Sequence, residues 1–227
     1  MSDASTPPDP AASPVDGLAP ALKAALRDCP RRDQEAFALR LARSRRDLER
    51  PLRRLYGHLD GFEDTLDRLV LRLAESFAAR PEALRLQDLK RDFEPDWFQR
   101  ETQVGYVFYV DRFAGSLLGV LDHLDYLEEL GVTYVHLMPC LMPRPGDSDG
   151  GYSVMDYRRI DPRLGTMADF ETVTTALRAR GISVCIDLVL NHTAKEHAWA
   201  EAARAGDPEK LAFYRTYEDR RMPDAFE

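Results

Sequence analysis

The feature that most constrains the fold is the segment 182–200, which reads ISVCIDLVLNHTAKEHAWA. Its first part, residues 182–190, is an apolar run rich in β-branched residues, and it follows Gly181, a residue typical of helix ends. Such a run predicts a strand that is buried on both faces, as in a parallel sheet. Asp187 lies inside this run, and it needs a partner because a buried, unpaired carboxylate is energetically costly.

The segments before this run alternate between strand and helix patterns. We predict strands at 104–110, 132–138 and 182–190, helices at 117–130 and 167–180, and a polar loop at 139–151. Gly131 and Gly181 stand where each helix should end. Short connections between alternating strands and helices predict an α/β fold with parallel strands and right-handed crossovers.

The N-terminal part of the chain has a different character. Residues 1–17 are rich in Pro, Ala, Ser and Asp, which predicts a disordered tail. Residues 18–99 show apolar side chains at helical spacing among many arginines, which predicts an all-helical domain. No spacing typical of a catalytic site occurs here. A solvated, arginine-rich face is the commoner interpretation, and a protein-docking face is the alternative.

Composition excludes several classes of function. The chain of 227 residues has 31 basic and 39 acidic residues, a net charge of −8, which argues against a nucleic-acid partner. No apolar run approaches the roughly 20 residues that span a bilayer, and no signal-peptide pattern is present, so we expect a cytoplasmic protein with no membrane partner. Cys29, Cys140 and Cys185 are far apart and read as structural thiols in a reducing compartment.

Polar residues follow each of the three predicted strands. Asp111 and Arg112 follow the first, the segment 147–152 (DSDGGY) follows the second, and Asn191 and His192 follow the third. These positions lie at the same edge of a parallel sheet, where ligands bind in α/β folds. Taken singly, Asp149 could be a turn residue, His192 a helix cap and Tyr152 a packing residue. Their shared location favours a binding site.

Several of these segments resemble a known family. The DLVLNH segment at 187–192 resembles the DxxxNH motif of the α-amylase superfamily (glycoside hydrolase family 13), a group of (β/α)8 barrel enzymes, and YVDRF at 109–113 resembles its first strand. A more specific resemblance, to the amylosucrases, rests on further segments. They are PDWF, VGYVFYVDRFAG, YLEELGVTYVHLMP, SDGGYSVMDYR, DPRLGTMADF, NHTAKEHAWA and FYRTYEDRRMPD.

The resemblance implies an enzyme that cleaves sucrose, releases fructose and transfers glucose to an α-1,4-glucan by a retaining double displacement. By matching motifs, His192 would donate a hydrogen bond to the glucose ring, and Tyr152 would stack under it. Asp149 would pair with an arginine and close the pocket. Sucrose and α-glucan are therefore the expected partners.

The same resemblance assigns supporting positions around the site. They are Asp187, Asn191, Asp111 and Arg112. No metal and no cofactor is expected, although the asparagine of this motif binds calcium in many α-amylases.

The resemblance further implies that residues 100–192 form the first three strands and βα units of a (β/α)8 barrel, preceded by the helical domain. Residues 193–227 would begin the excursion called domain B, cut short in this chain. The family's nucleophile and acid/base carboxylates would lie on later strands, so no catalytic residue is assigned here, and we expect the chain alone to be inactive. The alternatives are a sucrose hydrolase, another α-glucosidase or α-amylase, and a non-catalytic carbohydrate-binding remnant.

Overall fold

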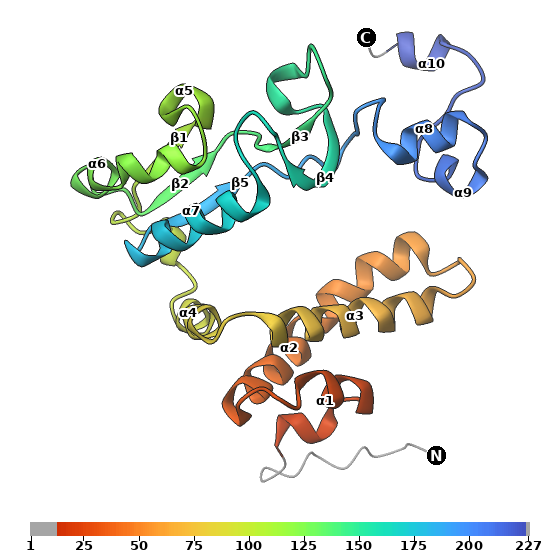
Figure 1. The fold of residues 1–227 in the computed structure, drawn as a ribbon. Helices are drawn as coiled ribbons and strands as arrows, with labels where there is room; N and C mark the ends of the chain where they lie inside the picture. Colours follow the sequence, from red (N-terminus) through yellow and green to blue (C-terminus); the bar gives the residue numbers. More distant parts are fainter. Residues whose placement is uncertain (1–12, 226–227) are drawn as a thin grey trace, which may run out of the picture. The chain divides into compact units, whose positions relative to one another are not determined.

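The computed structural model describes residues 13–225 and divides into two compact units, with the boundary between Trp97 and Phe98 (Figure 1). Most of the predicted N-terminal tail lies outside the described residues. Its last part differs from the prediction, because residues Pro14–Gly17 form a 3-10 helix, η1. Val15 in this turn is buried at 5% exposure, so an apolar anchor orders the chain here.

The first unit is helical throughout its described residues. Its elements are η1, α1 (Pro20–Leu26), α2 (Arg31–Tyr56), α3 (Phe62–Ala79) and α4 (Glu82–Phe93), followed by η2 (Trp97–Gln99) at the boundary. Helix α3 shows why: Phe62, Leu66, Val70 and Ala74 recur every four residues, and all four are buried. Apolar burial along this stripe, not helix propensity alone, stabilises the helix.

The second unit is an α/β structure. Its strands are β1 (Gly105–Phe108), β2 (Tyr134–Leu137), β3 (Leu141–Pro143), β4 (Val154–Ile160) and β5 (Ser183–Ile186). Its helices are α5 (Val110–Ala114), η3 (Leu118–His123), α6 (Leu124–Glu129), η4 (Asp149–Gly151), α7 (Met167–Ala179), α8 (Ala198–Arg204), α9 (Pro208–Leu211) and α10 (Arg221–Asp224).

Strand β2 is the centre of a three-stranded parallel sheet with the order β1-β2-β5. Val135 and Leu137 on β2 are fully buried, and Leu127, Val173 and Leu177 from the connecting helices belong to the same core. The parallel arrangement predicted from the alternating pattern is therefore confirmed. Gly131 and Gly181 have φ values of 72° and 75°, the left-handed conformation expected after a helix.

The strand predicted at residues 182–190 is longer and more buried than the strand that the structure forms there. Strand β5 ends at Ile186, so Asp187 lies beyond it, and Leu188 and Leu190 are 63% and 79% exposed. Cys185 is also exposed. The physical reason is the length of the partner: β2 ends at Leu137, opposite Ile186, and no ladder continues beyond that pair.

The predicted first strand and the predicted loop also differ from the structure. Strand β1 ends at Phe108, two residues before the predicted end, and Asp111 and Arg112 lie in the short helix α5. The segment 139–151 contains β3, which pairs antiparallel with β4. This pairing has register shifts on both sides of Met142, and such bulges hide the alternating pattern that marks a strand. The predicted helix at 117–130 divides into η3 and α6.

Across residues 13–225, every helix is too short or too polar to traverse a bilayer.

Substitution of Leu177 by Ala should destabilise the second unit by about 2–5 kcal/mol, because the fully buried side chain leaves a cavity in the core. Met167→Ala is the matched control, since Met167 starts the same helix and is 46% exposed. Urea denaturation followed by circular dichroism measures both. Equal midpoints for the two variants would contradict this account of the core.

Candidate functional site

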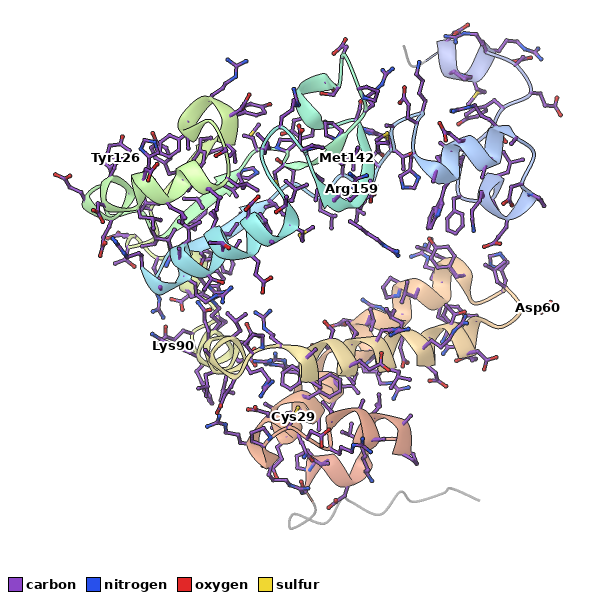
Figure 2. All side chains as sticks on the ribbon, viewed as in Figure 1. Cys29, Asp60, Lys90, Tyr126, Met142 and Arg159 are labelled. Atoms are coloured by element: carbon purple, nitrogen blue, oxygen red, sulfur yellow. The ribbon has the colours of Figure 1, made fainter. Side chains whose placement is uncertain are left out.

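The candidate site lies at the carboxyl edge of the parallel sheet. Phe108, Leu137 and Ile186 end their strands in register with one another. The segments that follow the three strands therefore begin at one edge. The β3–β4 hairpin, which includes Met142 and Arg159 (Figure 2), follows β2 from this edge.

Asp187, just beyond β5, is largely buried and pairs with a histidine. Its carboxylate lies 3.2 Å from Nε2 of His136 on β2, and the side chains are 22% and 31% exposed, respectively. Sequence reasoning required a partner for Asp187 but missed His136. The available signal was the position of this histidine inside the predicted second strand, and the structure pairs it in register with Cys185 of β5.

Tyr152 lies next to the same carboxylate. Burial raises the pKa of the Tyr152 phenol, and the negative charge of Asp187 raises it further, with smaller contributions from Tyr109, a hydrogen bond with Asp187, and Asp149. A phenol is already protonated near pH 7, and the raised pKa extends this neutral form to higher pH. The ring is therefore an uncharged surface with one hydrogen-bond donor.

His192 reaches Tyr152 through the backbone. Its Nε2 lies 3.3 Å from the carbonyl oxygen of Tyr152, and its ring is exposed. The hydroxyl of Tyr157 on β4 lies 2.6 Å from the carbonyl oxygen of Val189 and 3.1 Å from that of His192. The structure thus brings Tyr152, Asp187 and His192 together. Tyr157 was missed because β4 was not recognised as a strand.

Asp149 occupies a strained turn. It is the one non-glycine residue with positive φ among those described, at 53°, and Gly150 and Gly151 follow at 64° and 96°. Asp149 is exposed, and its backbone N–H donates a hydrogen bond to Oδ1 of Asp147 at 3.4 Å. Strain of this kind persists where the surroundings impose it, and it concentrates at functional sites.

Asp111 and Arg112 line a separate polar cavity of about 300 Å³, which shares Gly150 and Gly151 with the strained turn. The same cavity includes Asp161, which is 4% exposed, and Arg163, whose Nη2 lies 2.6 Å from Asp161 Oδ2. The two predicted support residues are therefore placed behind the turn, beside an ion pair that the sequence did not reveal.

Asn191 is exposed, and no hydrogen bond of its side chain is found within residues 13–225. Its supporting role stays a prediction. In the same part of the chain, no group of three or more His, Cys, Asp or Glu side chains is placed to hold a metal ion.

Comparison of the chain with known proteins identifies its family. The family model for the alpha amylase catalytic domain matches residues 62–226. Trehalose-6-phosphate hydrolase of Escherichia coli (strain K12) is 38% identical over 127 residues, which cover 53% of this chain and 22% of that protein. Oligo-1,6-glucosidase of Heyndrickxia coagulans is 42% identical over 101 residues, which cover 44% of this chain and 18% of that protein.

Solved structures of related enzymes also match. Trehalose-6-phosphate hydrolase of Bacillus licheniformis is 35% identical, covering 49% of this chain and 21% of its own, with a TM-score of 0.44. The trehalulose synthase MutB E254Q mutant in complex with sucrose is 30% identical, covering 57% and 24%, with a TM-score of 0.48.

The chain belongs to the alpha-amylase family and forms part of its catalytic domain. It spans about a fifth of the length of the curated relatives that it matches. The expected resemblance to the superfamily is confirmed at this level. The parallel sheet and its helices fit the first part of a (β/α)8 barrel.

Substitution of Gly151 by Ala should disrupt the strained turn. An added Cβ would lie 2.9 Å from Cβ of Pro139, and the positive φ adds a cost of its own. Gly146→Ala is the matched control, because Gly146 has a φ of 76° but open space around it. We expect about 1–2 kcal/mol of destabilisation for Gly146→Ala and about 1–3 kcal/mol more for Gly151→Ala, measured by urea denaturation. Indistinguishable variants would contradict the close approach to Pro139.

The cysteines should differ sharply in reactivity. Burial, with a smaller effect from Asp187, raises the pKa of the Cys140 thiol to about 11, whereas Cys185 is exposed. Iodoacetamide labelling at pH 8, read by mass spectrometry, should modify Cys185 in the folded chain and Cys140 only after unfolding. The folded state holds the Cys140 proton more tightly than the unfolded state does. The free energy of unfolding should therefore fall as the pH rises from about 9 to 11. Equal labelling of both would contradict the burial of Cys140.

Proposed function

We propose that this chain carries the donor-glucose subsite of an amylosucrase-type glucosyltransferase. The enzyme would act on sucrose, release fructose and transfer glucose to an α-1,4-glucan. One observation carries the proposal: Tyr152 and His192 meet beside Asp187 at the carboxyl edge of a parallel sheet. They do so in a chain of the alpha-amylase family whose SDGGY, EHAWA and DRRMPD segments resemble amylosucrase.

Tyr152 would be the platform under the glucose ring. Sugar rings present apolar C–H faces, which bury well against an aromatic face. The phenol is uncharged, and its hydroxyl is hydrogen-bonded to Asp187. His192 would donate a hydrogen bond to a glucose hydroxyl, and such a bond helps most if it strengthens in the transition state.

Asp149 would close the subsite by pairing with an arginine. Its carboxylate is exposed on a turn whose backbone is held in the left-handed region. A strained turn that presents an exposed carboxylate beside Tyr152 fits a residue selected for binding. Asp187, Asn191, Asp111 and Arg112 would support the site. Asp187 would act through Tyr152 and His136.

Retaining cleavage of a glycosidic bond requires two carboxyl groups about 5–5.5 Å apart. One acts as the nucleophile and the other as the acid/base. The resemblance assigns neither group to residues 1–227. This chain's own contribution would therefore be to bind and orient the glucosyl group. We expect no turnover of sucrose by the purified chain, and turnover that is lost on changing His192 would contradict that expectation.

Two other functions remain as alternatives, and the titration described below distinguishes them from the proposed one. The relatives named above are a trehalose-6-phosphate hydrolase and an oligo-1,6-glucosidase, and both names favour a glucosidase as the runner-up. A carbohydrate-binding role without chemistry would use the same side chains. We also propose that residues 18–99 form a helical domain and that residues 193–227 begin the domain B excursion.

Titration of the isotope-labelled chain with sucrose and glucose, followed by NMR, tests the proposal. Both sugars should shift signals of Tyr152 and His192. Tyr152→Ala should weaken binding about tenfold or more, because a buried aromatic face contributes about 1.5–3 kcal/mol, whereas Tyr152→Phe keeps the face and most of the affinity.

Tyr217→Ala is the control, since Tyr217 is another tyrosine of the second unit and is 54% exposed, whereas Tyr152 is half-buried. Equal affinities for Tyr152→Ala and the unmodified chain would contradict the proposal. Tighter binding of trehalose than of sucrose would favour the glucosidase alternative.

A further inference from the structure

We propose that Tyr157 is a positioning residue. Its hydroxyl keeps the backbone of residues 189–192 in a turn and thereby keeps His192 beside Tyr152. The sugar-binding consequence rests on the proposed function. The positioning itself does not, because it concerns contacts within the chain.

The Tyr157 hydroxyl joins both ends of this segment. It donates to the carbonyl oxygen of Val189 at 2.6 Å, and the carbonyl oxygen of His192 lies 3.1 Å from the same oxygen. A hydroxyl has a single proton, so the shorter contact is the principal bond and the longer one shares the proton. Two carbonyls three residues apart can converge on one donor only if the backbone between them turns.

The segment has few other anchors. Strand β5 ends at Ile186, and Leu190 is 79% exposed. Val189 is partly buried against the core, and the His192 ring contacts the carbonyl oxygen of Tyr152. The next backbone anchor is Ala194, whose N–H donates to Val154 on β4 at 2.9 Å. His192 lies between the end of β5 and that anchor. A hydrogen bond in this gap therefore has a large effect on where the imidazole lies.

Tyr157 is itself fixed from two sides. It lies on β4, and its ring is partly buried against the core of the second unit. The ring meets the edge of His197, with 5.8 Å between centroids and an angle of 64°. His197 is oriented in turn, because its Nδ1 accepts the N–H of Trp199 at 3.2 Å at the start of α8. The Tyr157 phenol is protonated near pH 7 and can donate, and burial raises its pKa further.

The experiment is Tyr157→Phe in the isotope-labelled chain, which removes the hydroxyl and keeps the ring against His197. The imidazole signals of His192 should shift, while those of His136, bonded to Asp187, should stay in place. The backbone amide signals of residues 190–193 should shift as well, because the carbonyls of Val189 and His192 lose their shared donor. Sucrose affinity should fall about fivefold, the factor that one neutral hydrogen bond typically contributes.

Tyr134→Phe is the matched control. It removes a hydroxyl from a partly exposed tyrosine on β2 that has no hydrogen bond to the 189–192 segment. Unchanged His192 imidazole signals and unchanged amide signals of residues 190–193 in Tyr157→Phe would overturn the proposal. If the unmodified chain binds no sugar, the proposed function fails, and the amide and imidazole signals still decide the role of Tyr157.

A measurement on the unmodified chain covers the case in which Tyr157→Phe does not fold. A hydroxyl held by Val189 at 2.6 Å should give a separately resolved, slowly exchanging proton signal with cross-peaks to residues 189–192. A Tyr157 hydroxyl in fast exchange with water would overturn the proposal.

Discussion

The rest of the second unit depends on the parallel pairing of β2 with both β1 and β5. Parallel strands cannot be joined by tight turns, so each connection must cross the sheet as helix, and the helices supply the other half of the core. The same pairing aligns the ends of the strands. Tyr109, the β3–β4 hairpin and Asp187 therefore start from one edge, and a site can form from segments far apart in the sequence.

The cost of burying polar groups explains how that edge is organised. Asp187 is largely covered, so its carboxylate is paired with His136 and lies beside the phenol of Tyr152. These contacts link β2, the turn before β4 and the segment after β5. The need to pair a buried carboxylate thus fixes Tyr152 relative to β2 and to the start of the segment that carries His192.

The proposed site stands on irregular backbone supported by regular elements. Asp149 is in a left-handed turn, and His192 is in a segment that no ladder reaches. Loops of this kind bind ligands in many folds because a rigid scaffold presents them. Here the scaffold acts through specific contacts, among them the bonds from Tyr157 to the backbone of the His192 segment.

The sequence by itself determined the helical N-terminal pattern, the parallel order of the strands and the edge at which polar residues gather, because apolar periodicity and glycines such as Gly131 encode them locally. It did not determine where strands end, since a ladder stops where its partner stops, as β5 does opposite Leu137. It also did not give β3, whose irregular register removes the alternating pattern. The partners of Asp187 and the placement of Tyr157 were decided only by the tertiary structure, because they join residues 32–51 positions apart whose proximity no local pattern records.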